Sequence, residues 1–214
     1  ADFASQFSKD SRYRTELYKL RRKFMSHADG LIHADLHTSN ILASRDEMKV
    51  IDMEFAFMGP FGYDLGYLVG NIISQYCAAC FKRFPSEQNR KQFKAYLLAT
   101  IKSLIETYMK TFTLCWERSV KERYRGQQGL LQSILQEVMV DMPGYASMVN
   151  WFRSVSDIPY PDFDVIENKD AKRNATVLSL MIDWGIMFGR YKYQSADDLI
   201  ETIIGIEEEF RKSL

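Results

Sequence analysis

The sequence has no excess of charge of either sign. Its 28 Lys and Arg residues balance its 28 Asp and Glu residues, so the formal net charge at pH 7 is zero. Nucleic acids and anionic membranes attract proteins that carry a basic excess. We therefore expect neither nucleic acid nor membrane as the main partner, and a small-molecule substrate or a protein partner instead.

Cysteine is scarce and long apolar runs are absent. The three cysteines, Cys77, Cys80 and Cys115, are an odd number in apolar surroundings, which indicates a reducing compartment rather than a disulfide framework. The Cys77-x-x-Cys80 pair could serve redox or metal chemistry, but no second pair exists, and core packing is the preferred interpretation. No stretch reaches the roughly 18 apolar residues of a membrane span, and residues 1–30 hold no apolar signal-peptide core. We expect a soluble, cytoplasmic protein.

Hydrophobic periodicity predicts an α+β protein that is predominantly helical. Apolar positions at spacings of three and four predict an amphipathic helix over residues 8–26. A segment rich in turn residues follows, and it predicts two short strands around a polar loop and then a hairpin turn at 44–47. The Pro-bearing stretch 142–169 predicts loops with a short helix at most. The other predicted helices span 64–81, 87–118, 129–140, 170–191 and 196–212.

The residues that point to chemistry lie in the segment 33–54. Asp35 sits in the polar loop, and Asp52 follows Asn40 by twelve residues. Phosphoryl transfer needs a carboxylate that orients the attacking hydroxyl and accepts its proton, and oxygen ligands that hold Mg²⁺ against the phosphates of ATP. Asp35 suits the first task, and Asn40 and Asp52 have the spacing of the catalytic-loop Asn and the metal-binding Asp of kinases. The alternative interpretation is a set of ordinary loop carboxylates.

This segment resembles a motif of the aminoglycoside phosphotransferase and choline kinase superfamily. Its members carry His-Gly-Asp-x-x-x-x-Asn followed by Ile-Asp-x-Glu, and at Ala34 they usually have Gly. We expect Ala to be tolerated there if the backbone keeps negative φ. The run 51–66, Ile-Asp-Met-Glu-Phe-Ala-Phe-Met-Gly-Pro-Phe-Gly-Tyr-Asp-Leu-Gly, is similar to the signature of the S-methyl-5-thioribose kinases. The superfamily motif is matched at His33, Asp35, Asn40, Ile51, Asp52 and Glu54.

The resemblance implies a protein-kinase-like C-terminal lobe in which a small β-hairpin carries the catalytic and metal loops. Residues 1–214 would form this single lobe, with 31–66 as the catalytic and metal-binding segment and 67–214 as a helical body. It also implies ATP and Mg²⁺ as cofactors and phosphorylation of S-methyl-5-thioribose, a step of methionine salvage.

The resemblance further assigns roles to individual residues. Asp35 would be the catalytic base, and His33 and Asp64 would be structural, the first packed under the loop and the second accepting hydrogen bonds from loop backbone N–H groups. His37 and Trp116 would border the substrate, although a hydrogen-bonded loop histidine and a packing tryptophan remain open interpretations. Metal and nucleotide binding would fall to Asn40, Asp52 and Glu54.

The N-terminal nucleotide lobe of a complete kinase is not recognisable. That lobe carries a glycine-rich loop and a strand Lys, whereas this sequence contains no G-x-G-x-x-G and only about thirty residues before His33. We expect the lobe to be truncated or supplied by another chain, and the isolated chain to be weakly active or inactive. An exposed apolar surface is expected where the lobe would sit, which invites a homodimer or another partner.

A late helix departs from the methylthioribose kinases. They carry an adjacent Arg pair where this sequence has Asp183-Trp184, and Arg173 or Arg190 are candidates to replace it. Two other functions stay open: a kinase for an aminoglycoside, choline or homoserine, and a non-catalytic helical binding module derived from a kinase. The acidic run at 207–209 is predicted to be a solvated helix face.

Overall fold

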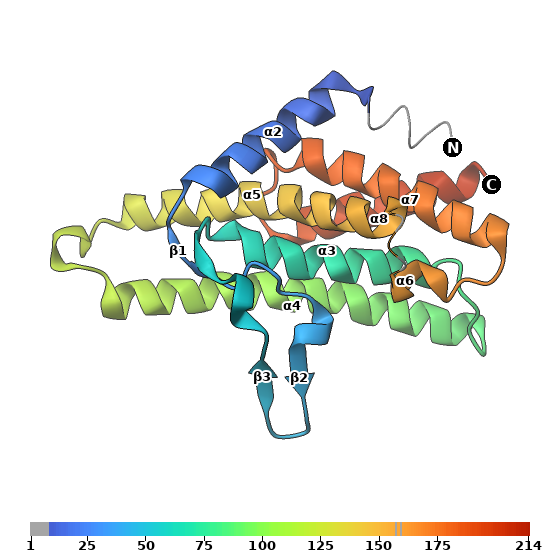
Figure 1. The fold of residues 1–214 in the computed structure, drawn as a ribbon, viewed down its shortest axis with the longest axis horizontal. Coiled ribbons are helices and arrows are strands. Elements are labelled where there is room, and N and C mark those ends of the chain that lie inside the picture. The colour runs from blue at the N-terminus through green and yellow to red at the C-terminus, as the bar shows by residue number, and fades with distance from the viewer. Residues whose placement is uncertain (1–8, 157, 159) are drawn as a thin grey trace.

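The computed structural model describes residues 9–156, 158 and 160–214 (Figure 1). Within these residues the protein is α+β and predominantly helical, as predicted. The predicted helix start at residue 8 lies outside the described residues. In chain order the elements are α2 (Ser11–Ser26), β1 (Gly30–Ile32), η1 (Thr38–Asn40), β2 (Ile41–Ala43), β3 (Met48–Val50), η2 (Met53–Phe55), β4 (Phe57–Gly59), α3 (Gly62–Ala79), α4 (Glu87–Ser119), η3 (Glu122–Tyr124), α5 (Gln128–Val155), α6 (Pro161–Asp164), α7 (Lys169–Gly189) and α8 (Ala196–Lys212).

Helix α3 lies in the middle of the helical body, with α5, α4 and α7 packed around it (Figure 1). Most of its residues are buried, and two of its glycines allow α5 to approach closely. A Cβ on Gly66 would lie 2.6 Å from the Met142 carbonyl oxygen, and a Cβ on Gly70 would lie 2.6 Å from the Ala146 carbonyl oxygen. The two backbones are therefore nearly in contact, and α3 is held rigidly at its N-terminal half.

The prediction of loops over 142–169 is wrong for its first part, because α5 continues through Pro143 to Val155. Proline removes one backbone hydrogen bond from a helix interior. Here residues around Pro143 are buried against α3, and the burial outweighs that cost. In the turn before the proline, Arg190 donates from Nη1 to the Val140 carbonyl oxygen at 3.1 Å. The short helix predicted within the same stretch is confirmed by α6.

The short strands form two separate antiparallel pairs. Strands β2 and β3 form the predicted hairpin, which projects from the helical body (Figure 1). Strand β1 pairs with β4, in a register that aligns Gly30 with Gly59; β4 was not predicted from the sequence. As a result the polar loop, 33–40, lies between β1 and β2, and the segment with Asp52 and Glu54 lies between β3 and β4. The two loops therefore belong to the same small region of the structure.

Exposed apolar side chains are frequent in this β region, in agreement with the expected exposed apolar surface. Leu31 and Met48 are each about 70% exposed. Soluble chains rarely leave many large apolar groups of one segment in water unless another surface covers them. The other exposed large apolar residues of the segment are Leu42, Val50, Ile51, Met53, Phe55 and Met58.

Two predictions about single residues are wrong. Cys115 is exposed rather than set in apolar surroundings, whereas Cys77 and Cys80 are buried in the core as expected. Glu207 is not solvated: it is buried on α8 and accepts hydrogen bonds from Tyr76 and Lys94. Among the described helices, none combines the length and the apolar character needed to cross a membrane.

Candidate active site

Asp64 fixes the backbone of the loop that carries Asp35. Its Oδ2 accepts a hydrogen bond from the His33 N–H at 2.6 Å, and its Oδ1 accepts one from the Ala34 N–H at 2.9 Å. Burial raises the pKa of Asp64, although the two N–H donors act in the opposite direction. Because Asp64 stands in the first turn of the rigid α3, the loop is anchored to the helical body, as the sequence predicted.

The Ala34 backbone adopts a conformation that L-residues avoid. Its φ is 68°, in the left-handed region, so the condition of a negative φ, under which Ala is expected to be tolerated, is not met. For a residue with a Cβ, this left-handed conformation costs about 1–2 kcal/mol, a cost that glycine does not have. The two hydrogen bonds that Asp64 accepts from the His33 and Ala34 N–H groups hold this geometry in place. They explain how the loop keeps its shape with Ala where related sequences usually have Gly.

His33 joins the two loops beneath the surface. The imidazole is buried, its Nε2 lies 2.8 Å from the Ile51 carbonyl oxygen, and its Nδ1 lies 3.3 Å from the Asp35 N–H nitrogen. A carbonyl only accepts and an N–H only donates, so the ring carries its proton on Nε2. His33 therefore ties the residue before Asp52 to the backbone of Asp35, and its predicted structural role is confirmed.

Asp35 lies on the loop with a partly exposed carboxylate. Its Oδ2 is 3.4 Å from His37 Nε2, and its side chain interacts with the hydroxyl of Tyr67 on α3. Burial, and then this contact, raises the pKa of Tyr67, which keeps the phenol protonated as a hydrogen-bond donor. The carboxylate is positioned by its neighbours and still open to a ligand. This is the arrangement that a general base for an alcohol requires.

Asn40 and Ile51 bring the second loop to the first. The Asn40 side chain is buried, with Nδ2 donating to the Asp35 carbonyl oxygen at 3.0 Å. The Asn40 carbonyl oxygen in turn accepts from the Ile51 N–H at 3.0 Å. Asn40 thus stabilises the loop, and its side-chain oxygen accepts no hydrogen bond from any residue that the structure describes.

Asp52 and Glu54 present exposed carboxylates on the second loop. Asp52 adopts a left-handed backbone with φ 68°, and both residues are exposed. In the part of the chain that the structure describes, neither carboxylate makes a hydrogen bond or an ion pair, and no three His, Cys, Asp or Glu side chains converge on one metal position. Mg²⁺ characteristically takes one or two carboxylates and completes its shell with phosphates and water. Two free carboxylates and the Asn40 amide oxygen fit such an ion.

Trp116 does not share a cavity with Asp35. It lies near the end of α4, where its ring stacks near Phe112 at a centroid distance of 6.4 Å. It lines a cavity of about 240 Å³ together with Lys23 and Asp141, and no residue between 33 and 54 lines that cavity. These neighbours of Trp116 agree with a packing role, and a substrate contact by Trp116 remains a prediction.

Three residues bear on the missing Arg pair: Asp183, which stands in its place, and the candidate replacements Arg190 and Arg173. Asp183 is fully buried, with Oδ1 accepting from Asn150 Nδ2 at 2.8 Å, and burial raises its pKa well above the ordinary range. Arg190 is buried as well, and its guanidinium donates to Glu16 at 2.8 Å. Neither side chain is available to a ligand. Arg173 is exposed on α7.

The sequence of this chain is similar to those of known phosphotransferases over the region that contains both loops. Residues 4–104 match the model of the APH phosphotransferase enzyme family. Over these residues the chain is similar to this phosphotransferase family. A methylthioribose kinase of Geobacillus thermodenitrificans is 32% identical over 198 residues, which are 92% of this chain and 48% of the relative. One of Geobacillus kaustophilus is 33% identical over 89% of this chain and 46% of the relative, and one of Bacillus cereus strain B4264 is 29% identical over 88% and 45%.

The chain thus spans about half the length of the curated relatives it matches. Its matched region contains both loops and the anchoring Asp64. Sequence reasoning missed Tyr67, the side chain that reaches Asp35 from α3. Its position three residues after Asp64, one helical turn further along α3, is the signal that could have revealed it, because such residues share a helix face.

Proposed function

We propose that this chain carries the catalytic and metal-binding segment of a kinase that transfers a phosphoryl group from ATP to a hydroxyl of a small sugar, with Mg²⁺. Asp35 accepts the proton of the attacking hydroxyl, and Asp52, Glu54 and Asn40 hold Mg²⁺, which neutralises charge on the phosphates when bound. The observation that carries the proposal is the joint anchoring of both loops by Asp64 and His33, with three carboxylates left open to ligands.

S-methyl-5-thioribose is the acceptor we propose, which would give the protein a role in methionine salvage. The similarity to curated methylthioribose kinases over about nine-tenths of the chain supports it. A panel assay tests it: ATP and Mg²⁺ are supplied to the longest natural polypeptide that carries this chain, with methylthioribose, an aminoglycoside, choline and homoserine as acceptors. We expect phosphate transfer to methylthioribose at the highest kcat/KM. A higher value for one of the other three would assign the protein to another branch of the family.

We further propose that residues 1–214 need additional polypeptide, in the same chain or a partner, for rapid turnover. The exposed apolar residues between 31 and 58 support this, since they offer a surface for another lobe or a second copy. Substantial phosphorylation by the purified 214-residue chain would contradict it. We propose the cytoplasm as the site of action, which the three free thiols support.

A non-catalytic binding module is the second candidate. It is favoured by Asp183, a buried carboxyl where methylthioribose kinases carry an Arg pair. Such a module requires no Mg²⁺-dependent ATP binding, so nucleotide titration with and without Mg²⁺ separates the two functions.

A further inference from the structure

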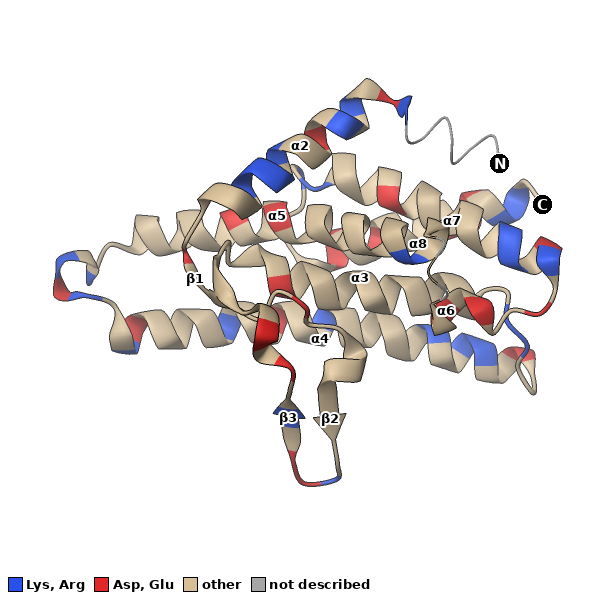
Figure 2. Ribbon diagram, in the orientation of Figure 1, with Lys and Arg blue, Asp and Glu red and all other residues tan. Residues whose placement is uncertain are grey.

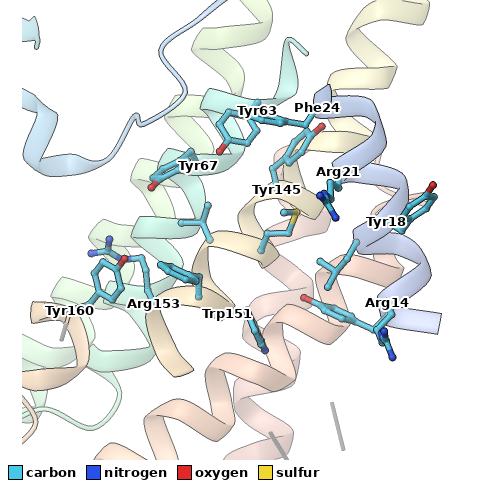
Figure 3. A pocket seen from close by; sticks show the side chains of 15 residues that line it. Arg14, Tyr18, Arg21, Phe24, Tyr63, Tyr67, Tyr145, Trp151, Arg153 and Tyr160 are labelled. Atoms are coloured by element: carbon cyan, nitrogen blue, oxygen red, sulfur yellow. The ribbon is translucent and has the colours of Figure 1, made fainter. Parts of the chain in front are cut away.

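A cavity of about 610 Å³ lies between α2, α3 and α5 (Figure 3). Aromatic side chains make up much of its wall, among them Tyr63 and Tyr67 from α3 and Tyr145 and Trp151 from α5. In Figure 3 the α2 residues lie on one side of the cavity, and Tyr160 lies on the opposite side. A concave site of this size, lined by aromatic groups, is suited to a small organic molecule.

Tyr67 connects this cavity to Asp35. Its ring lines the cavity, its hydroxyl interacts with the Asp35 carboxylate, and its ring centroid lies 6.4 Å from that of His37. Tyr63, one turn earlier on α3, lines the same wall. Burial, with the charges of Asp64 and Asp35, raises the pKa of Tyr63 to about 12, so both phenols remain neutral donors at physiological pH.

The charged residues of the cavity are all basic. Arg14 and Arg21 from α2 and Arg153 from α5 line it, and no Asp or Glu does so within the described residues. Figure 2 shows the predominance of basic residues along α2. Arg153 is neutralised by Asp162, with Nε to Oδ2 at 2.6 Å, whereas Arg14 and Arg21 form no ion pair with any described residue. Two unpaired cations therefore repel a cationic ligand and tolerate a neutral or anionic one.

Resting on the phosphotransferase activity proposed above, we propose that this cavity is the acceptor site, that Tyr67 positions the Asp35 carboxylate, and that the cavity selects an uncharged or anionic alcohol with an apolar substituent. The acceptor oxygen forms a bond to the γ-phosphorus of ATP while its proton passes to Asp35. The bond between that phosphorus and the oxygen of the departing ADP breaks. Tyr67 is a positioning residue, and Arg21 is a selectivity residue.

Charge selection is tested first, by calorimetry without nucleotide on the 214-residue chain. The probes are S-methyl-5-thioribose, which is neutral, and kanamycin, which is cationic. We expect methylthioribose to bind about tenfold or more tightly than kanamycin. Arg21→Glu should narrow that ratio about fivefold, whereas Arg22→Glu, the same charge change on the neighbouring residue outside the cavity, should leave it unchanged.

The positioning role is tested by steady-state transfer in the longest natural polypeptide that carries the chain. Tyr67→Phe keeps the ring and removes the hydroxyl, so we expect kcat to fall about tenfold with KM changed less than about threefold. Tyr96→Phe, at an exposed position on α4, is the matched control and should match the unsubstituted protein. Thermal melting of each variant verifies that the fold is kept.

Several results would overturn the proposal. They are no binding of methylthioribose by the 214-residue chain, equal binding of kanamycin, the same change of ratio in the Arg21 and Arg22 variants, and an unchanged kcat in Tyr67→Phe. If the unsubstituted protein transfers phosphate to no acceptor, the proposed function fails, while the calorimetric comparison still decides whether the cavity takes uncharged alcohols.

Discussion

The β region, residues 30–59, and the helical body are held together by different physical means. In the body, α3 and α5 approach so closely that added Cβ atoms at Gly66 or Gly70 would overlap α5. In the β region the strands are three residues long, and the non-glycine residues with positive φ in the described chain, Ala34 and Asp52, both lie there. The comparison teaches that the body supplies rigidity, while the strained and exposed segment carries the residues of the proposed chemistry.

Substitution of Asp35 should give the largest difference between an effect on activity and an effect on stability. Asp35→Asn keeps the shape of the side chain but cannot accept a proton, so we expect phosphoryl transfer to fall by a factor of about 10²–10⁴. The melting temperature should stay close to that of the unsubstituted protein, since Asp35 lies outside the core. Asp46→Asn, at an exposed position in the hairpin turn, is the control and should transfer normally. Retained activity in Asp35→Asn would remove this residue from the mechanism.

Asp64 couples the two regions, so its substitution should affect both. Asp64→Ala leaves the N–H groups of His33 and Ala34 without their acceptor, and we expect a loss of about 3 kcal/mol in the free energy of unfolding. Asp64→Asn retains one oxygen acceptor and should lose less. Urea denaturation measures both losses, and equal stability of all three proteins would show that the loop does not depend on α3.

A glycine pair tests the close packing of the body alone. Gly66→Ala places a methyl group 2.6 Å from the Met142 carbonyl oxygen and should destabilise the fold by about 1–3 kcal/mol. Gly205→Ala, in the interior of α8 with open space around it, should stabilise it by up to about 1 kcal/mol. Differential scanning calorimetry gives both values. The same sign for both substitutions would contradict the packing account.

Backbone strain in the β region can be relieved by one substitution. Ala34→Gly removes the side chain at φ 68° and should raise the free energy of unfolding by about 1 kcal/mol. Ala43→Gly, within strand β2, should instead lower it by about 0.5–1 kcal/mol. Chemical denaturation of the pair distinguishes strain from a general effect of glycine; destabilisation by both would mean that Ala34 is unstrained.

The contact between α2 and the end of α7 should depend on acid pH. Burial alone would raise the pKa of Glu16, but hydrogen bonds from Lys19, Tyr191 and Arg190 lower it to about 2. The pKa of Glu in an unfolded chain is about 4.3. The stabilisation of the fold by ionised Glu16 is therefore complete above the pKa of the unfolded chain and is lost as the pH falls towards 2. Glu16→Gln should flatten the acid limb of a stability profile, and Glu208→Gln, at an exposed position, should leave it unchanged.

The chemistry-bearing segment could be predicted from the sequence because its geometry is local. The roles of His33 and Asp64 followed from the motif, and the structure confirms them. The first residues of two helices were also predictable, because each helix begins with a clear N-cap. Ser86 caps α4 by accepting from the Asn89 N–H, and a capping box of Ser195 and Asp198 starts α8.

Features that depend on tertiary contacts were not predictable. Pro143 reads as a helix breaker, yet burial against α3 keeps α5 helical through it. Glu207 belongs to an acidic run, yet Tyr76 and Lys94 from other helices bury and pair it. Strand β4 is three residues long and exists through its pairing with β1. In each case the deciding partner lies far away in the sequence, where periodicity carries no information.

Calorimetric titration of ATP in the presence and absence of Mg²⁺ tests the central claim most directly. The experiment uses the longest natural polypeptide that carries this chain, with Asp52→Ala and the control Asp46→Ala. We predict Mg²⁺-dependent binding that is lost in Asp52→Ala and kept in Asp46→Ala. Binding that is independent of Mg²⁺, or unchanged in Asp52→Ala, would contradict the assignment of this segment as the metal and phosphate site.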